Sequence, residues 1–291
     1  MKMNFNYYLK KLQHSTKSIK SCEKSVDRYL EWLREQAIEP EQVSYSDILA
    51  YMQSVQKNGA TQRTIQNYLN MVKHYYDYLV EQNKMDNNPV SRITIHGVKR
   101  KSLYHIFKPE ELHNIYASYE DASPKGKRNK IMLGLLVYQG VKTDELDKLE
   151  VSHVKLEEGA IEIPGGRKSN WRLLSLESHQ VLEFYDYINI VRNEILEQSQ
   201  QRTNKLFVSI EGGDSFSSCI TRLMFWVKRK NKLVVNAKQL RSSVIVNWMK
   251  VYSLRKVQYL AGHRFISSTE AYQQSDMEGL TEEVNKFHPL N

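Results

Sequence analysis

The sequence predicts a mainly α-helical protein with one small antiparallel β-sheet, arranged as a helical domain followed by an α+β domain. Three observations carry this prediction. Apolar residues recur at intervals of three and four along most of the chain, a spacing typical of helices that bury one face. Residues 160–164 and 171–176 read as two short strands on either side of a Gly-Gly turn, as in a β-hairpin. The 291 residues are enough for two hydrophobic cores.

The first domain is expected to span residues 1–90 and to be entirely helical. Residues 1–17 are polar and basic, and the sequence leaves open whether they form a short arm or the first half-turn of a helix. Helical spacing of apolar positions then predicts three helices: one from Ser18 to about Gln36, one through residues 48–55, and one that begins after Thr61 and runs through Leu79.

Capping and breaking residues set the ends of these helices. Ser46 and Asp47 can cap the second helix, and Thr61 precedes the third. An Asn-Gly pair ends the second helix and an Asn-Asn-Pro stretch stops the third. Residues 91–105 have little apolar periodicity and contain three consecutive cations, so we expect a basic linker.

The second domain is expected to span residues 106–291. The pattern predicts, in order, a helix from Pro109, an apolar helix around 131–137, a short helix that Thr143 can cap, the hairpin, a helix at 177–199, a third strand at 206–209, a helix at 216–230 and a helix containing Lys238 and Arg241. An amphipathic tail follows Tyr272.

Composition narrows the possible partners. The net charge of +9 favours a polyanionic partner, because the field of such a chain attracts phosphates. Cys22 and Cys219 follow no metal-ligand spacing, so we expect free thiols in a reducing compartment and no metal or other cofactor. Neither a signal peptide nor an apolar run of membrane-spanning length is present. We therefore expect a cytoplasmic protein without a membrane partner.

The end of the chain carries the residues with the clearest chemistry. Lys238 and Arg241 are three positions apart on a predicted helix, so both can meet one anion. His263 and Tyr272 follow them. Two cations and an imidazole beside a tyrosine can lower its pKa, neutralise a pentacoordinate oxyanion and protonate a leaving alkoxide. This set predicts a tyrosine that attacks phosphorus.

The stretch LAGHRFISSTEAYQQ at residues 260–274 resembles the end of tyrosine recombinases of the Xer and phage-integrase type. In that family a Leu-Gly-His box is followed nine residues later by the nucleophilic tyrosine, and a His-x-x-Arg box lies upstream. The upstream box reads Lys238-x-x-Arg241 in this chain. The boxes occur in family order along almost the whole chain, so the resemblance implies a helical core-binding domain followed by a catalytic domain.

The resemblance implies further site residues. At Lys142 the family has the first of its two phosphate-binding arginines, and Glu145 matches an acidic residue that either orients this cation or favours the helix dipole. A lysine at the hairpin turn donates a proton to the leaving 5′ oxygen in the family; Lys168 matches it, with Arg167 as the second choice. The implied catalytic set is Tyr272, Arg241, His263, Lys168, Lys142 and Lys238.

Basic residues outside this set are candidate DNA contacts. They are Arg63 and Lys73 in the first domain, Lys99, Arg100 and Lys101 in the linker, and Arg167 at the hairpin. Such side chains can contact phosphates or base edges. For any one of them, a solvated surface position is the simpler interpretation.

Two of the six expected active-site groups depart from the family pattern, and both are lysines in this chain. Lys142 keeps the charge but lacks the planar fork that binds two phosphate oxygens at once. Lys238 replaces a histidine, and an ammonium group cannot accept a proton. These replacements leave open a catalytically impaired DNA-binding protein of the same fold that acts as an architectural or competing factor. Because both replacements are cations, we favour an active or weakened enzyme.

The resemblance implies a site-specific recombinase or integrase. Tyr272 would cleave DNA through a 3′-phosphotyrosyl intermediate and release a 5′-hydroxyl, and the strand would then be joined to a partner duplex. The implied partner is double-stranded DNA, bound by a homo-tetramer on two sites that exchanges C-terminal tails. The implied location is the nucleoid.

Overall fold

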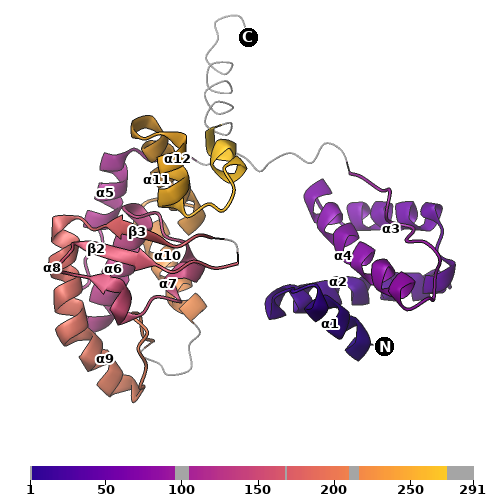
Figure 1. Ribbon diagram of the computed structural model, residues 1–291, viewed down its shortest axis with the longest axis horizontal. Helices are drawn as coiled ribbons and strands as arrows, with labels where there is room; N and C mark the ends of the chain where they lie inside the picture. The colour runs from indigo at the N-terminus through magenta and orange to yellow at the C-terminus, as the bar shows by residue number, and fades with distance from the viewer. Residues whose placement is uncertain (1, 96–104, 168, 210–215, 274–291) are drawn as a thin grey trace, which may run out of the picture. The chain divides into compact units, whose positions relative to one another are not determined.

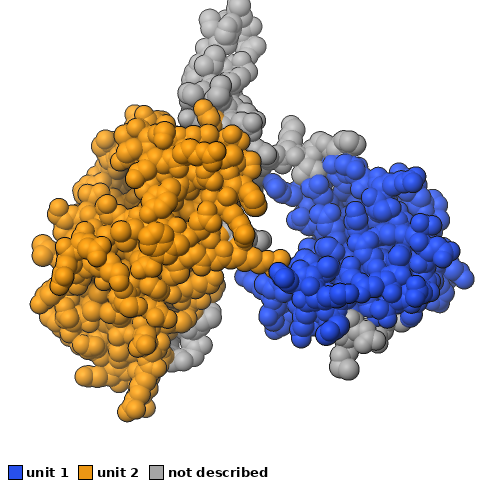
Figure 2. Space-filling view, viewed as in Figure 1, with its two compact units in different colours: residues 1–101 blue, residues 102–291 orange. Residues whose placement is uncertain are grey.

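The computed structural model describes residues 2–95, 105–167, 169–209 and 216–273. The chain divides into two units, residues 1–101 and 102–291 (Figure 2). In both units, helices make up most of the described residues. The described part of the second unit also contains a three-stranded antiparallel sheet (Figure 1). This confirms the predicted fold class.

The described part of the first unit is built from helices alone. Its elements are α1 (Lys2–Lys11), α2 (Thr16–Glu35), the 3-10 helix η1 (Pro40–Gln42), α3 (Tyr45–Lys57) and α4 (Gln62–Glu81). The helix α4 packs against α1, α2 and α3. It is therefore the central helix of this unit.

The first helix resolves a point that the sequence left open. Residues 2–11 form a helix of ten residues instead of a short arm or a half-turn. Phe5 and Leu9 are four positions apart and both are buried. The Phe5 ring packs against Tyr75 and Tyr78, with ring centroids 5.6 and 5.4 Å apart. Packing against α4 thus stabilises a segment too short to be a stable helix alone.

The cap of α3 lies two residues before the one predicted. Ser44, not Ser46, is the capping residue: its Oγ accepts a hydrogen bond from the Asp47 backbone N–H at 3.3 Å, and Asp47 Oδ2 accepts one from the Ser44 N–H at 2.8 Å. This reciprocal capping box satisfies two otherwise unpaired donors. Thr61, after which the sequence predicts the third helix to begin, is the N-cap residue of α4.

The segment after α4 is fastened to the first unit by Asn88. Its side-chain amide donates to the Lys73 carbonyl at 3.0 Å and to Asp77 Oδ1 at 2.6 Å. Val90 is buried. The helix itself ends at Glu81, before the Asn-Asn-Pro stretch, and Asn88 holds the returning chain against it.

The second unit combines helices with the sheet. Its described elements are α5 (Pro109–Ala117), α6 (Pro124–Val137), α7 (Thr143–Leu146), the 3-10 helix η2 (Val151–His153), β1 (Val154–Lys155), β2 (Ala160–Ile163), β3 (Arg172–Ser175), α8 (Ser178–Asp186), the π-helical segment η3 (Tyr187–Val191), α9 (Arg192–Ser199), α10 (Phe216–Lys230), α11 (Ala237–Val251) and α12 (Leu254–Ala261). Residues 267–273 are also helical. The strand order is β1-β2-β3, and Ile163 pairs with Arg172 at the hairpin end of the sheet.

The third strand of the sheet is not the one predicted. It is β1, which precedes the hairpin, whereas residues 206–209 form no strand. Leu206 donates its N–H to the Leu149 carbonyl at 2.8 Å, and Lys205 makes an isolated bridge with Glu150. Residues 206–208 are buried. A short apolar run indicates burial but does not by itself distinguish a strand from another buried segment.

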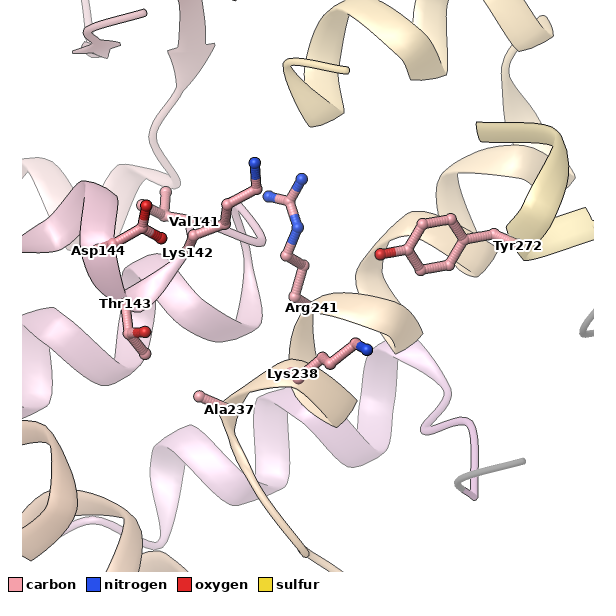
Figure 3. A pocket seen from close by; sticks show the side chains of 8 residues that line it. All are labelled: Val141, Lys142, Thr143, Asp144, Ala237, Lys238, Arg241 and Tyr272. Carbon is pink, nitrogen blue, oxygen red and sulfur yellow. The ribbon is translucent and has the colours of Figure 1, made fainter. Parts of the chain in front are cut away.

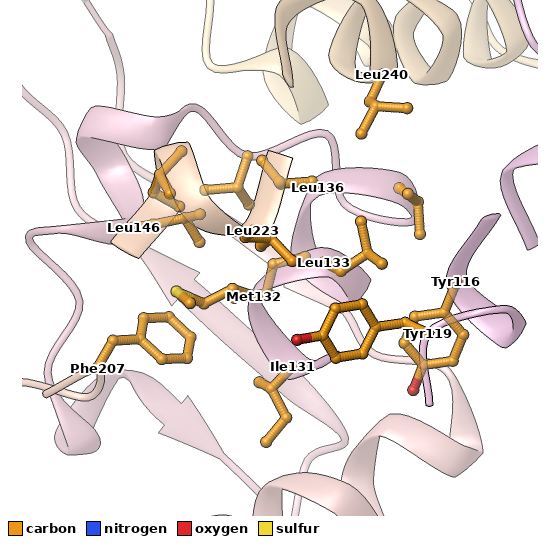
Figure 4. Close-up of a cluster of buried hydrophobic side chains, with 14 of the residues drawn as sticks. Tyr116, Tyr119, Ile131, Met132, Leu133, Leu136, Leu146, Phe207, Leu223 and Leu240 are labelled. Carbon is orange, nitrogen blue, oxygen red and sulfur yellow. The ribbon is translucent and has the colours of Figure 1, made fainter. Parts of the chain in front are cut away.

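The helix α6 forms the centre of the second core. All its residues from 131 to 137 are buried, as expected for a helix that is apolar on every side. It packs against α5, α8, α9 and α11, and Figure 4 shows Met132, Leu133 and Leu136 among the buried side chains of neighbouring elements.

The turn after α6 brings the start of α7 close to α11. Gly140 has a φ of +56°, and a Cβ atom there would lie 3.1 Å from Val244 Cγ1 in α11. Glycine therefore permits both the left-handed backbone and the close approach. This turn sets the position of Lys142.

Candidate active site

One pocket gathers four residues that the sequence singles out. It has a volume of about 270 Å³. Residues from the starts of α7 and α11 and from the helical residues 267–273 line it (Figure 3): Val141, Lys142, Thr143, Asp144, Ala237, Lys238, Arg241 and Tyr272. Three cations and one phenol therefore border a single cavity.

Arg241 is fixed by backbone carbonyls. It lies on α11 and is 5% exposed. Its Nη1 donates to the Gly140 carbonyl and its Nη2 to the Ala261 carbonyl, the latter at 2.6 Å. Burial lowers the pKa of Arg241, while nearby Glu145 opposes this shift. These bonds orient the guanidinium and tie α11 to the turn after α6 and to the end of α12.

Lys142 precedes α7 and is held by Glu145. The Lys142 N–H donates to Glu145 Oε2 at 2.9 Å, and its Nζ lies 3.8 Å from Glu145 Oε1. Lys142 is thus the N-cap residue, and Thr143, the predicted cap, is the first helical residue. Burial lowers the pKa of Lys142, and the charge of Arg241 adds to this effect. Figure 3 shows the Lys142 amine on the same side as the Arg241 guanidinium.

A buried ion pair lies behind these cations. Arg172 on β3 is 0% exposed, and its Nη1 and Nη2 donate to the two carboxylate oxygens of Glu145 at 3.1 and 2.8 Å. Burial raises the pKa of Glu145, but its hydrogen bonds and ion pair with Arg172 outweigh burial, so the pKa lies below its ordinary value.

Arg172 was not predicted as part of the site. It is buried on the same side of β3 as Leu174. A charged residue at an inward-facing position of an otherwise apolar strand is the signal that could have identified it. Its guanidinium lies against Gly262, where φ is +63° and where any Cβ atom would collide with Arg172 Nη1.

His263 follows this glycine and is 7% exposed. Its Nε2 lies 3.4 Å from Arg241 Nη2, and its Nδ1 lies 2.9 Å from the Thr269 hydroxyl. Burial, and then the positive charge of Arg241, lowers the pKa of His263 to about 4. The ring is therefore neutral at pH 7. Thr269 was not predicted as part of the site.

Tyr272 faces the pocket from the helical residues 267–273. Its ring stacks on His263, with centroids 5.6 Å apart and planes 15° from parallel. It also packs against the small cluster of Ile245, Val257 and Ala261. Figure 3 shows its hydroxyl pointing toward Arg241.

Lys238 and the hairpin complete the predicted catalytic set. Lys238 is exposed at the first turn of α11 and borders the pocket. Lys168 lies outside the described residues. Beside it, Ser169 pairs with His263, and the Asn170 N–H donates to the Gly262 carbonyl at 3.0 Å. Ser169 and Asn170, which follow Lys168, are thus hydrogen-bonded directly to the backbone of Gly262 and His263.

The predicted DNA contacts divide between surface positions and undescribed residues. Arg63 is exposed at the first turn of α4, whereas Lys73 is half-buried on the same helix. Arg167 is exposed, and its carbonyl accepts a hydrogen bond from Arg264 Nη1 at 3.1 Å. The linker cations Lys99, Arg100 and Lys101 and the C-terminal tail beyond residue 273 lie outside the described residues.

The arrangement suits chemistry at a phosphate. The cations of the pocket can bind an anion and neutralise charge that develops on it. A tyrosine hydroxyl at the same pocket can act as a nucleophile. In the described ranges, no three His, Cys, Asp or Glu side chains form a group that could hold a metal ion, and the helices there include none with the length and apolarity of a membrane span.

Family models match both units of the chain. The model of the phage integrase family matches residues 105–279, more than half of the chain, and the model of the phage integrase N-terminal SAM-like domain matches residues 4–83. Tyrosine recombinase XerC of Anoxybacillus flavithermus is 23% identical over 98% of this chain and 97% of its own length. Tyrosine recombinase XerD of Listeria innocua is 25% identical over 94% of this chain and 93% of its own.

Solved structures share the fold. The XerH site-specific recombinase, in a post-cleavage complex with its palindromic difH substrate, aligns with a TM-score of 0.74 and 20% identity over 92% of this chain and 79% of its own. The Tn1549 transposon integrase, in complex with a circular intermediate DNA, aligns with a TM-score of 0.67 and 14% identity over 94% of this chain and 98% of its own. The family resemblance predicted from the sequence is confirmed.

Proposed function

The chain belongs to the phage integrase family of tyrosine recombinases, and from this premise we propose that it is a site-specific recombinase that cleaves and rejoins DNA strands. One observation carries the proposal. The Tyr272 hydroxyl faces a pocket that Lys142, Lys238 and Arg241 border. A DNA phosphodiester in this pocket would meet a nucleophile on one side and cations around its oxygens.

The cleavage step is a transesterification. The Tyr272 oxygen attacks phosphorus, a bond forms between them, and the bond from phosphorus to the 5′ oxygen breaks. The products are a 3′-phosphotyrosyl link and a 5′-hydroxyl. The covalent link retains the energy of the phosphodiester, so a 5′-hydroxyl from a partner duplex can reverse the step and join the new strand.

Two proton transfers accompany this step. Neutral His263 carries a lone pair on Nε2 that can accept the Tyr272 proton. A bound phosphodiester brings a negative charge to the pocket and raises the pKa of His263, which makes the imidazole a stronger base. The 5′ oxygen takes its proton from Lys168, the hairpin lysine of the family pattern.

The cations have separate roles in this proposal. Arg241 is held rigidly and orients the phosphate, whereas Lys142 and Lys238 supply charge without a planar fork. We therefore expect weaker orientation of the phosphate, and a lower cleavage rate, than two arginines would give. A catalytically impaired DNA-binding protein remains the outcome to be tested against.

The proposal extends to the assembly on DNA. The first unit, through Arg63 and Lys73, and the basic linker with Lys99, Arg100 and Lys101, would hold the duplex by its phosphates. Recombination needs two duplexes, and a homo-tetramer that exchanges C-terminal tails would bring them together. The working location would be the nucleoid.

Covalent capture from random DNA tests the proposal and identifies the target site in the same experiment. A library of nicked palindromic duplexes with randomised arms is incubated with the protein, and adducts that survive denaturant are sequenced. We expect an enriched sequence with the wild-type protein and no adduct with the matched Tyr272→Phe variant. DNA that is retained without any adduct, even after Lys142→Arg and Lys238→His are introduced together, would indicate a binder in place of an enzyme.

A further inference from the structure

The side chain of Thr269 is buried beside His263 and has no role so far. Thr269 is 0% exposed, and its Oγ1 lies 2.9 Å from His263 Nδ1. The other ring nitrogen, Nε2, lies 3.4 Å from Arg241 Nη2. Each nitrogen of this imidazole therefore has a different neighbour.

The two neighbours determine where the ring proton sits. A guanidinium has only N–H donors, so Nε2 must be the acceptor in its contact with Arg241. A neutral imidazole has one donor and one acceptor nitrogen. The proton is therefore on Nδ1 and is donated to the Thr269 hydroxyl, which can accept it.

Thr269 also connects His263 to the nucleophile. Residues 267–273 form one helical stretch, and Thr269 and Tyr272 are three positions apart on it. Residues at this spacing lie on the same side of a helix. The Tyr272 ring stacks on the same imidazole that Thr269 contacts. One helix thus presents both the nucleophile and the hydroxyl that orients the ring.

We propose that Thr269 is a positioning residue for the recombination reaction: its hydroxyl accepts the Nδ1 proton of the tautomer that Arg241 selects, and thereby holds Nε2 toward Arg241 and the pocket. The proposal rests on the proposed function for its catalytic consequence, but the tautomer itself is a property of the free protein. With the proton on Nδ1, Nε2 can take the Tyr272 proton. With the opposite tautomer, it cannot.

Nitrogen NMR of the full-length protein tests the tautomer directly. In ¹⁵N-histidine-labelled protein near pH 7, His263, assigned by comparison with His263→Gln, is expected to show a protonated Nδ1 and an unprotonated Nε2. Thr269→Ser keeps a hydroxyl and is expected to keep this pattern. Thr269→Val matches the shape of threonine but removes the acceptor. Because Arg241 still faces Nε2, the proton is expected to stay on Nδ1, but its ¹H signal should shift upfield and exchange faster with water than in the wild-type protein. Ser268→Ala removes an exposed hydroxyl from the same helix and is expected to change nothing in the spectrum.

Single-turnover cleavage tests the consequence for the reaction. On a captured site, Thr269→Val is expected to lower the cleavage rate on the order of tenfold or more, as the loss of a partner that orients a ligand histidine does, with DNA affinity unchanged within about twofold. Thr269→Ser is expected to restore most of the rate. A structural role alone would reduce affinity and thermal stability together and would leave the Nδ1–H signal as it is.

The outcomes separate the two proposals. An Nε2–H tautomer in the wild-type protein would overturn the inference even if Thr269→Val does not fold. An unchanged Nδ1–H signal in a folded Thr269→Val protein would do the same. If the spectra agree with the inference but no variant cleaves DNA, the proposed function fails and the assignment of the Thr269 contact stands.

Discussion

The two units of the chain treat charge in opposite ways inside their cores. In the described part of the first unit, the buried side chains are apolar or aromatic, apart from Ser25. The hydroxyls of Tyr29 and Tyr76 satisfy each other in a 2.7 Å hydrogen bond. The buried residues described in the second unit include five charged side chains: Arg128, Glu145, Arg172, Arg192 and Arg241.

This difference distinguishes a core that only stabilises its unit from a core that also positions charged side chains. Burying an ion costs several kcal/mol unless well-placed partners compensate. Arg128 Nη1 donates to the Val208 carbonyl at 2.6 Å, and Arg192 Nε donates to the Lys205 carbonyl at 2.9 Å. Arg172 is compensated by the carboxylate of Glu145. A core made for stability alone would avoid these groups. The second unit retains them, and Arg241 borders the pocket while the pair of Glu145 and Arg172 lies directly behind it.

The largest effect on stability is expected when the buried ion pair loses one partner. Arg172→Met leaves the Glu145 carboxylate buried without its main partner, since Lys142 Nζ lies 3.8 Å away, and this should destabilise the second unit by about 3–5 kcal/mol. Urea unfolding can follow this unit through Trp171, Trp226 and Trp248 in a Trp32→Phe background. The double variant Arg172→Met with Glu145→Met should recover most of the lost stability. A loss under about 1 kcal/mol in the single variant would contradict the conclusion that Arg172 and Glu145 form a buried ion pair.

Acid is expected to act on the second unit through His263. Its pKa is about 4 in the folded chain and near the ordinary value of 6.5 in the unfolded chain, so the unfolded state binds a proton first as pH falls. The stability that neutral His263 contributes is fully present above about pH 6.5 and is lost as the pH falls from about 6.5 to 4. Below that range it does not change further. We expect a loss of roughly 1–3 kcal/mol, because solvent partly screens the ring. In His263→Gln this component of the pH dependence should vanish; if it persists, other groups are responsible.

A smaller effect is expected from a polar contact in the first unit. Tyr29→Phe removes one hydroxyl of the buried pair and should cost about 1 kcal/mol. The Tyr29 ring stacks on Trp32 at 6.4 Å, so the fluorescence of this unit can be isolated as the difference between proteins with and without Trp32. Tyr29→Phe combined with Tyr76→Phe should be nearer to wild type, since no hydroxyl is left unpaired. If Tyr29→Phe lowered the free energy of unfolding as much as Arg172→Met does, the two cores would not differ in how strongly they depend on buried polar contacts.

The smallest effect on stability is expected at the pocket itself. Lys142→Arg keeps the charge at a half-buried position and should change the free energy of unfolding by less than about 0.5 kcal/mol. Cleavage should rise by roughly tenfold, because one additional charge-assisted hydrogen bond to the phosphate contributes about 1.5 kcal/mol. Single-turnover rates on a captured site provide the measurement, with Lys148→Arg as the matched control outside the pocket. Equal rates for wild type and Lys142→Arg would mean that the planar fork is not what limits this enzyme.

Much of the fold could be predicted because local patterns and packing agree. The helix at 216–230, the hairpin and the cap at Thr61 all carry local signals and lie where those signals indicate. The first helix and the strand β1 do not. Phe5 is buried only because α4 supplies Tyr75 and Tyr78, and the two residues of β1 are too few to show an alternation.

The candidate site divides in the same way. Four of the six residues in the predicted catalytic set border the pocket, since each belongs to a recognisable sequence box. Arg172 and Thr269 have no such box. Arg172 matters because it contacts Glu145, and Thr269 because it contacts His263. Both contacts form only when the chain folds, and a single sequence does not show them. The roles of the six residues stay predictions until the cleavage experiments are done.

Gly262 gives one letter of the sequence signature a physical origin. The glycine belongs to the box by which the chain can be recognised, yet it has no reactive atom. It is required for two reasons: its backbone is left-handed, and the Arg172 guanidinium occupies the volume in which any other side chain would begin. A smaller residue in place of Arg172 would free that volume, but the left-handed backbone would still favour glycine. This letter of the motif therefore records how two segments of the chain fit together rather than what the enzyme does.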